Sequence, residues 1–195
     1  MLRLDCLREL APLMHEDLAV VALGGTTDEW SHVRPSDANF YNVGMGTNVP
    51  LAMGLAFALP HRRVTLLDTD GSQLMTLGAL CTLANHPPSN LRVFVMDNES
   101  YAYTGNQPTA TAGKADLGAI ARAAGIEQAV SVAKIDEFRT IATHAMSGEG
   151  LRYIVAKVET AAPSGFVRGF DHLEAKYRFV RHVERLERKQ IMSRS

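Results

Sequence analysis

The chain has 195 residues, 46% of them hydrophobic and 21% charged, as is usual for one globular domain. Its 20 Lys and Arg nearly cancel its 21 Asp and Glu, so no global basic field recruits nucleic acid. Because the two cysteines form no CxxC pair and no stretch has the length of a signal-peptide core or a membrane span, we expect a cytoplasmic protein with no thiolate-held metal cluster and no membrane partner.

The first third of the chain reads as helix, strand, loop and helix. Leucines at helical spacing predict an amphipathic helix at 2–14, and the apolar run DLAVVALG predicts a short strand at 17–24. The segment 26–39 is polar and interrupted by proline, so we expect a loop or a broken helix there. Small and apolar residues at 48–59 predict a tightly packed helix.

Strands and helices alternate through the rest of the chain. Apolar, β-prone runs predict strands at 64–69, 91–96, 129–133 and 153–159. Helical spacing predicts helices at 73–85, 116–124, 135–146 and 172–189. An extended loop is expected between Asn98 and about Lys114.

This alternation is typical of an α/β domain with a doubly wound, mainly parallel sheet and helices on both faces. We expect one domain over 1–195, with a helical C-terminal tail at 169–195. Ligands of such sheets bind beyond the carboxyl ends of the strands. Asp70-Gly71-Ser72 follows one predicted strand and Asp97-Asn98 follows the next, so we expect both segments to face one crevice.

The residues at these two strand ends suit a cation and a diphosphate. Asp70 and Asn98 offer hard oxygen ligands, which Mg²⁺ or Ca²⁺ prefers. Gly71 allows close approach of the backbone, and Ser72 can cap the next helix while its N–H faces an anion. The alternative for Asp70 alone is an ordinary helix cap. Neither a GxGxxG fingerprint nor a P-loop is present.

Three segments resemble the thiamin-diphosphate-dependent enzymes. The pair TDGS…DN, with 25 residues between Gly71 and Asp97, resembles the family signature GDGS…NN. NVGMGTNVPLAMGLAFA at 42–58 resembles the segment that precedes GDGS in decarboxylases of this family. YAYTGNQPT at 101–109 resembles a loop of the small subunits of sulfopyruvate and phosphonopyruvate decarboxylases.

The resemblance implies a set of cofactor contacts. Asp70, Asn98 and the backbone carbonyl of Ser100 would hold Mg²⁺, while backbone donors of Gly71 and Ser72 would bind the diphosphate of thiamin diphosphate. The other residues implied to contact the cofactor are Val43, whose carbonyl would bind the aminopyrimidine, Gly44, Met45 as a wedge beneath the cofactor, and Tyr101. For Met45 the alternative is an ordinary core methionine.

Three positions depart from the family pattern. Thr69 replaces the first glycine of GDGS, which costs little if the backbone stays extended. Asp97 replaces the first Asn of NN and brings a carboxylate near the diphosphate, which weakens cofactor binding unless this side chain turns away. Tyr103 stands where a smaller residue is more common and would reshape the substrate pocket.

The resemblance also implies a missing part. In this family a glutamate that activates the pyrimidine belongs to a separate pyrimidine-binding domain, and a chain of 195 residues has no room for it. We therefore expect a partner (alpha) subunit in a hetero-oligomer. The tail could pack on that partner, although packing on its own sheet is the reading we favour. Candidate substrate contacts, on thinner grounds, are His32, Thr104, Asn106 and Gln107.

The resulting hypothesis is a subunit of a thiamin-diphosphate-dependent 2-oxo acid decarboxylase, with a sulfonated or phosphonated pyruvate as the leading substrate. Two alternatives stay open. A subunit of a 2-oxo acid:ferredoxin oxidoreductase is disfavoured because cluster-binding cysteines are missing. A non-catalytic sensor that binds thiamin diphosphate would need no partner.

Overall fold

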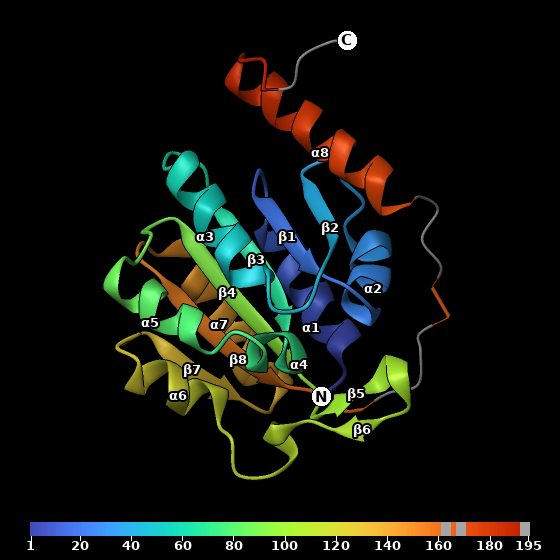
Figure 1. Cartoon of the computed structure of the whole chain (residues 1–195), viewed down its shortest axis with the longest axis vertical. Coiled ribbons are helices and arrows are strands. Elements are labelled where there is room, and N and C mark those ends of the chain that lie inside the picture. The colour runs from blue at the N-terminus through green and yellow to red at the C-terminus, as the bar shows by residue number, and fades with distance from the viewer. Residues whose placement is uncertain (161–164, 167–170, 192–195) are drawn as a thin grey trace.

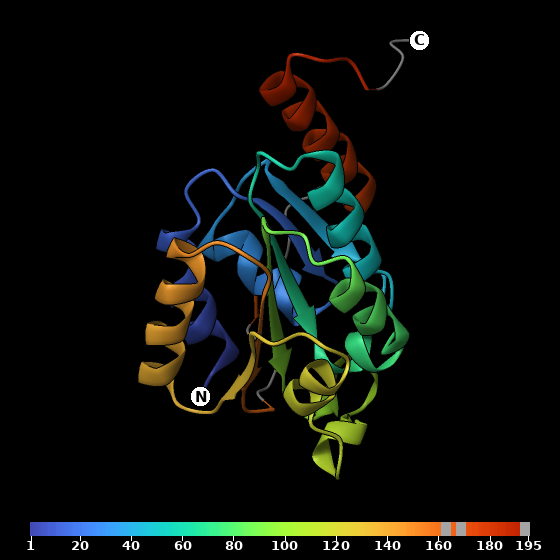
Figure 2. The same ribbon diagram turned by 90° about the vertical axis from the view of Figure 1, so that its left-hand side faces the viewer.

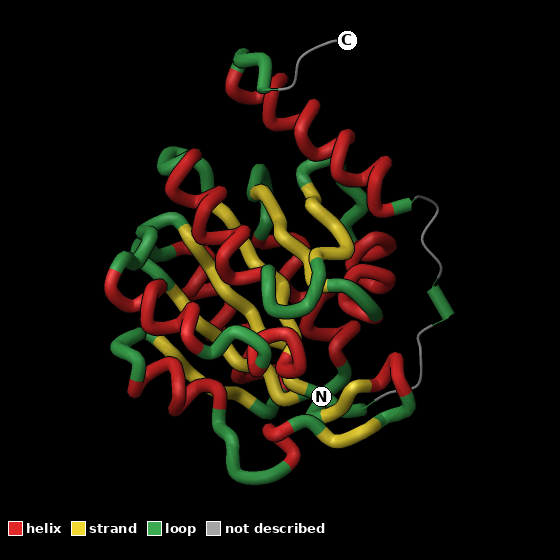
Figure 3. Tube along the Cα trace, viewed as in Figure 1, coloured by secondary structure: helices red, strands yellow, loops and turns green. Residues whose placement is uncertain are grey.

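Six parallel strands of the described chain form one central sheet between two layers of helices. The computed structural model describes residues 1–160, 165–166 and 171–191. The strands of the sheet are β1 (Leu18–Ala22), β2 (Asn39–Val43), β3 (Val64–Thr69), β4 (Leu91–Asp97), β7 (Ala129–Val132) and β8 (Arg152–Lys157). Their order is β2-β1-β3-β4-β8-β7, and Figure 3 shows them gathered in one layer with helices around it.

The helices cover both faces of the sheet, as a doubly wound fold requires. They are α1 (Arg3–Leu10), α2 (Gly25–Val33), α3 (Asn48–Ala58), α4 (Asp70–Leu74), α5 (Gly78–Asn85), α6 (Leu117–Ala123), α7 (Ile135–Ser147) and α8 (His172–Glu187). Side chains of α1, α2 and α7 share one buried cluster, and those of α3, α5, α6 and α8 share the other. Figure 2 shows α1 and α7 on one side of the sheet and α3, α5 and α6 on the other.

Alternation along the strands divides the core between these layers. In β4, Val93 and Val95 belong to one cluster while Phe94 and Met96 belong to the other. Both faces of the central strands are therefore buried, which explains why their sequences are apolar runs. The fold class predicted from the sequence is confirmed.

Three local predictions are corrected by the structure. The segment 26–39, expected to be a loop or broken helix, starts with the regular helix α2, which ends just before Pro35, and finishes in the unpredicted edge strand β2. The single helix predicted at 73–85 is two helices, because the chain turns between Leu74 and Gly78. The loop predicted at 98–114 contains a hairpin of β5 (Ser100–Tyr101) and β6 (Gln107–Pro108), together with short 3₁₀ turns.

The C-terminal helix packs on the chain's own sheet. Ala175, Phe179 and Val183 of α8 are buried, and the Phe179 ring meets Phe40 of β2 edge to face at 5.3 Å. Figure 1 shows α8 lying across the end of β2. The predicted tail at 169–195 begins and ends outside the described residues. Within the described part of the chain, no helix is both long and apolar enough to cross a membrane.

Candidate functional site

The two predicted strand ends meet at one edge of the sheet. β3 and β4 are adjacent and parallel, with Thr69 paired to Met96. The residues that follow each strand therefore emerge side by side. One end of the Asn98 side-chain amide lies 3.1 Å from Asp70 Oδ1. The predicted convergence of these two segments is confirmed.

A third oxygen joins this pair. The same end of the Asn98 amide lies 2.9 Å from the backbone carbonyl oxygen of Ser100, so its nitrogen can donate to both oxygens. Mg²⁺ holds oxygens at about 2.0–2.1 Å in an octahedron, which places neighbouring ligand oxygens about 2.9 Å apart. With its amide oxygen turned inward, Asn98 would give three hard oxygens at that spacing. The residues present thus fit Mg²⁺, through one carboxylate rather than a cluster of acids.

Asp70 is a buried carboxylate with prearranged partners. Its side chain is 1% exposed, and its Oδ2 accepts a hydrogen bond from Thr109 at 2.7 Å and lies 3.3 Å from the Thr111 hydroxyl. Burial raises the pKa of Asp70, and the charge of Asp97 adds to this effect against the lowering effect of the Thr109 hydroxyl. A buried acid that is costly to ionise is stabilised when a cation binds beside it.

The carboxylate of Asp97, which departs from the family pattern, is neutralised within the chain. Its Oδ2 lies 2.9 Å from Nζ of Lys157, and its Oδ1 accepts a hydrogen bond from Thr111 at 2.7 Å. Asp97 and Lys157 face each other across the neighbouring strands β4 and β8. Burial alone lowers the pKa of Lys157, but hydrogen bonds to Glu99 and Asp97 outweigh it and raise this pKa. Asp97 is therefore held by a cation of its own chain.

Gly71 leaves room for two side chains that cover it. A Cβ at this position would lie 2.6 Å from Cε1 of Tyr101 and 3.3 Å from Cε of Met45, so any side chain would displace the tyrosine ring. Met45 is half-buried rather than a core residue. Glycine at 71 thus brings Tyr101 and Met45 together over the turn that follows β3.

A buried hydrogen-bond chain ties this turn to the loop that carries Met45. The Ser72 hydroxyl accepts from the Gly46 N–H at 3.1 Å and from Asn48 Nδ2 at 2.6 Å. Asn48 Nδ2 also donates to Asp68 Oδ1 at 2.6 Å. The Ser72 side chain therefore fixes the Met45 loop instead of capping the next helix. Sequence reasoning missed Asp68, because an acid within a strand has no motif of its own.

We expect Asp68→Asn to stabilise the protein above pH 6. Burial raises the pKa of Asp68 to about 6, against the lowering effects of Ser72, Thr69 and Asn48. Because the folded-state pKa lies above the unfolded value, wild-type stability falls as the pH rises from about 4 through about 6 and then levels off. An amide carries no such cost and keeps the acceptor for Asn48, so the gain grows with pH to about 3 kcal/mol at pH 7.

Thermal unfolding between pH 4.5 and 8 in EDTA measures this gain. The control is Glu16→Gln, an exposed acid whose loss should not change the melting temperature. An equal gain for Asp68→Asn at pH 4.5 and pH 8 would mean that its charge is not the cause.

Several predicted site residues share one cavity of about 130 Å³ at this edge of the sheet. The predicted residues that line it are Met45, Asp70, Gly71, Asn98, Ser100, Tyr101 and Thr104. Val43, Gly44 and Ser72 do not line it. The Val43 carbonyl accepts the Leu23 N–H at 3.1 Å, which leaves one lone pair for the predicted pyrimidine contact.

Two of the predicted substrate residues of the 104–107 loop, Thr104 and Gln107, bond to each other. Gln107 Nε2 donates to the Thr104 carbonyl at 2.9 Å, and the Thr104 hydroxyl donates to Gln107 Oε1 at 3.2 Å. Asn106 takes a left-handed backbone conformation, with φ of 59°. All three are exposed, and only Thr104 reaches the cavity. Their polar groups shape the β5–β6 hairpin that Figure 1 shows at this end of the sheet.

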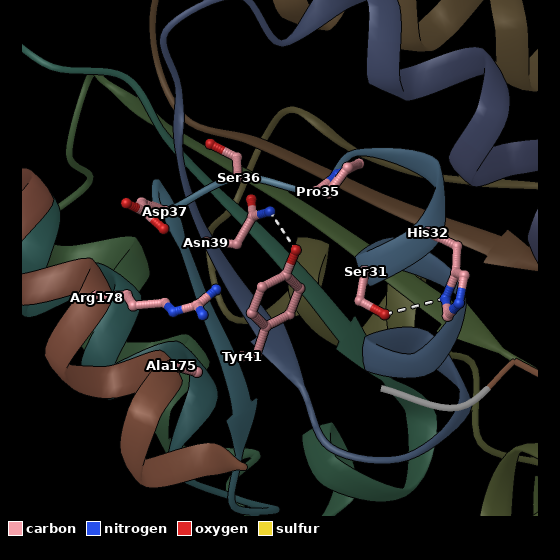
Figure 4. A pocket seen from close by; sticks show the side chains of 9 residues that line it. All are labelled: Ser31, His32, Pro35, Ser36, Asp37, Asn39, Tyr41, Ala175 and Arg178. Atoms are coloured by element: carbon pink, nitrogen blue, oxygen red, sulfur yellow. Dashed lines mark hydrogen bonds between the residues drawn. The ribbon is translucent and has the colours of Figure 1, made fainter. Parts of the chain in front are cut away.

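His32 lies away from this cavity. It sits in the last turn of α2, where Nδ1 is 2.9 Å from the Asp28 carbonyl oxygen and the ring stacks on Phe166 at 4.5 Å. It lines a separate cavity of about 430 Å³ between α2, β2 and α8. Figure 4 shows this second cavity, where Asn39 donates to the Tyr41 hydroxyl at 2.5 Å. The structure does not bring His32 to the predicted site.

Four residues that line the smaller cavity were not predicted from the sequence. Gly24, Gly25 and Thr26 line it where α2 begins, together with Arg3 of α1. The first N–H groups of a helix have no intrahelical partner and favour anions. Gly24 has φ of 87°, a conformation that suits glycine at this turn into the helix. The double glycine after the first predicted strand was the sequence feature that could have indicated this part of the cavity.

A family model of known proteins matches the central part of the chain. Residues 28–156 match the family model described as thiamine pyrophosphate enzyme, C-terminal TPP binding domain. Thiamine pyrophosphate is another name for thiamin diphosphate.

Relatives with similar sequences carry names of decarboxylases. The chain is 29% identical over 185 residues to sulfopyruvate decarboxylase subunit beta of Methanocaldococcus jannaschii, covering 94% of this chain and 97% of the relative. It is 39% identical over 124 residues to the subunit of the same name from Methanothermobacter thermautotrophicus, covering 63% of this chain and 66% of the relative. Identity to phosphonopyruvate decarboxylase of Streptomyces hygroscopicus is 35% over 144 residues, or 73% of this chain but 35% of that protein.

A solved structure of similar fold is benzoylformate decarboxylase from Polynucleobacter necessarius, with a TM-score of 0.66 and 20% identity. The match covers 82% of this chain and 33% of that one. The described fold therefore corresponds to about one third of that longer enzyme.

Proposed function

The chain belongs to the thiamine pyrophosphate enzymes, as their C-terminal TPP-binding domain, and we propose that it is the cofactor-binding subunit of a 2-oxo acid decarboxylase. The proposed substrates are sulfonated or phosphonated pyruvates. The observation that carries this proposal is the match, over nearly the full length of both chains, to a subunit named for sulfopyruvate decarboxylase. The relative named for phosphonopyruvate adds support for an acidic tail on the substrate.

In this proposal the strand-end residues hold the diphosphate end of the cofactor. Asp70, Asn98 and the Ser100 carbonyl bind Mg²⁺, which the spacing of their oxygens supports. Backbone donors of Gly71 and Ser72 face the diphosphate. The buried Ser72 hydroxyl keeps the Met45 loop in place, so that Met45 and the neighbouring Val43 and Gly44 support the rest of the cofactor.

A partner chain completes the site. None of the described residues that line the cavity is a glutamate, whereas the family chemistry needs one at the pyrimidine. The chain also spans only about one third of the phosphonopyruvate decarboxylase it matches, and the name "subunit beta" of other relatives denotes a multi-subunit enzyme. We propose that a pyrimidine-domain subunit supplies the glutamate and closes the cavity.

When bound, the cofactor supplies an electrophilic thiazolium that accepts the electrons released as the substrate loses carbon dioxide. The residues of this chain act by binding and orientation. Asp70 and its threonine partners fix the cation, and Tyr101 and Met45 cover Gly71. Tyr101 and Tyr103 also line the cavity.

The test is to purify the tagged protein gently from its own cells and to record a native mass spectrum, followed by a carbon dioxide release assay. We expect a second chain, thiamin diphosphate and Mg²⁺ in the complex. We also expect kcat/KM for sulfopyruvate or phosphonopyruvate to exceed that for pyruvate by about 100-fold, because a buried partner of the acidic tail is left unpaired by pyruvate.

A homo-oligomer that binds the cofactor but releases no carbon dioxide from any of these acids would favour the sensor hypothesis. The matched control for the assay is the complex with Asp136→Asn, an exposed acid of α7 far from the cavity in sequence. Its activity should equal that of the wild type.

A further inference from the structure

Arg3 brings a guanidinium into the cofactor cavity from outside the family match. It is the first residue of α1 and lines the same cavity as Asp70 and Asn98, yet the family model starts at residue 28. Its Nε and Nη2 form a bidentate pair with Glu29 at 2.8 and 2.9 Å. Glu29 is only 4% exposed. This buried carboxylate holds the Arg3 side chain in one orientation.

The remaining edge of this guanidinium is available. Both hydrogen bonds to Glu29 use Nε and Nη2, and none of the described residues accepts a hydrogen bond from Nη1 of Arg3. The guanidinium lies directly on Gly25, where a Cβ would be 2.3 Å from Nη2 and 2.8 Å from Cζ. Glycine at this position is therefore what allows Arg3 to lie beside the start of α2.

Other donors surround the same space. Thr26 also lines the cavity and is 1% exposed, and no described residue bonds its hydroxyl. Such an unpaired buried hydroxyl is costly unless a ligand supplies the partner. The free N–H groups of the first turn of α2 add the positive end of a nine-residue helix.

We propose that Arg3, the Thr26 hydroxyl and the first turn of α2 form an oxyanion site for a sulfonate, phosphonate or phosphate group. A fixed guanidinium edge, a hydroxyl and backbone N–H groups match the several oxygens of such a group. Glu29 balances the charge of Arg3, so the site recognises its oxyanion through geometry and hydrogen bonds. The inference rests on the proposed function for its ligand, which is either the acidic tail of the 2-oxo acid or a phosphate of the cofactor.

Three variants test the site. Arg3→Gln removes both the positive charge and the planar guanidinium, whereas Arg3→Lys keeps the charge but loses the guanidinium. Gly25→Ala keeps both Arg3 and Glu29 but displaces the guanidinium, so it tests the site even if Arg3→Gln fails to fold. The control is Arg8→Gln, because Arg8 is an exposed arginine of the same helix that does not line this cavity.

The first readout needs no catalysis. Binding of inorganic sulfate to the purified protein is measured by calorimetry, with chloride at equal ionic strength as reference. We expect Arg3→Gln and Gly25→Ala to weaken sulfate binding roughly 10- to 100-fold, as for the loss of a charge-assisted hydrogen bond, and Arg3→Lys to weaken it less. Arg8→Gln should bind as the wild type does.

Two further readouts distinguish the sources of the anion. If Arg3 holds the substrate tail, Arg3→Gln lowers kcat/KM of the native complex for sulfopyruvate and leaves that for pyruvate unchanged. If it holds a cofactor phosphate, the variant weakens binding of thiamin diphosphate relative to thiamin, and the ratio between the two substrates stays constant.

Unchanged sulfate binding, cofactor binding and substrate ratio in Arg3→Gln and Gly25→Ala would overturn the site. Sulfate binding that depends on Arg3 in a complex without decarboxylase activity would overturn the proposed function and leave the site standing.

Discussion

Replacing Asp70 by alanine or asparagine is expected to abolish Mg²⁺-dependent binding of thiamin diphosphate. Asp70 provides the charged oxygen among the proposed ligands, and Asn98 and the Ser100 carbonyl are neutral. Without the carboxylate, the protein would offer the cation only neutral oxygens in exchange for its water shell. We expect cofactor affinity to fall about 1000-fold, or roughly 4 kcal/mol, and activity to fall with it. Calorimetric titration of the native complex with cofactor, with and without Mg²⁺, measures the loss.

The protein without cofactor should remain folded when Asp70 is changed. Because burial raises the pKa of Asp70, its ionised form weakens the folded state in the absence of a cation, and Asp70→Asn removes that cost. The asparagine can still accept the hydrogen bond from Thr109. We therefore expect an unchanged or higher melting temperature in EDTA, with Asp136→Asn as control. Cofactor affinity that survives Asp70→Asn would show that the metal site lies elsewhere.

The part of this site that the sequence could predict lies within continuous motifs. Asp70 and Asn98 each follow an apolar strand, and strands of one parallel sheet end at the same edge, so their meeting follows from two local patterns. Largely apolar strands that are buried on both faces over nearly their whole length, such as β3 and β4, are the segments whose type a sequence predicts well.

The part that the sequence could not predict depends on packing between distant segments. Arg3 reaches the cavity only because α1 packs beside α2, which no local pattern records. The edge strand β2 was missed because its burial alternates and Asn42 has φ of 60°, so it reads as a polar turn. The helix break after Leu74 was not predicted because residues 75–77 contain no glycine or proline.

The role of Lys157 was hidden for a topological reason. The chain makes β7 before β8, yet β8 takes the place beside β4. The position of β8 between β4 and β7, rather than the sequence of β8, places Lys157 opposite Asp97. Strand order thus gives the Asp97 carboxylate a counter-charge from its own chain.

Replacing Lys157 by methionine is expected to destabilise the protein because it leaves the buried Asp97 carboxylate without its counter-charge. Asp97 is 1% exposed, and without Lys157 its Oδ2 loses the 2.9 Å contact. Removal of one partner from a buried ion pair costs roughly 3 kcal/mol here, the low end of the usual range, because Lys157 itself is 34% exposed. In a domain of this size the melting temperature should fall by roughly 6–12 °C. The unpaired carboxylate should also raise the pKa of Asp70 further and weaken binding of the anionic diphosphate of the cofactor.

The double variant Asp97→Asn/Lys157→Met separates the charge from the packing of the lysine stem. Asp97→Asn alone restores the family's NN pattern and leaves Lys157 paired with Glu99 at 2.6 Å. We therefore expect the free energy of unfolding to change by less than about 1 kcal/mol. If the ion pair is the reason for the loss in Lys157→Met, adding Asp97→Asn should recover about 2 kcal/mol of stability and most of the affinity for thiamin diphosphate. Additive losses would instead assign the effect to the methylenes of Lys157. Recovery would show that this chain carries an aspartate in place of the family's asparagine because a lysine from a neighbouring strand supplies its counter-charge.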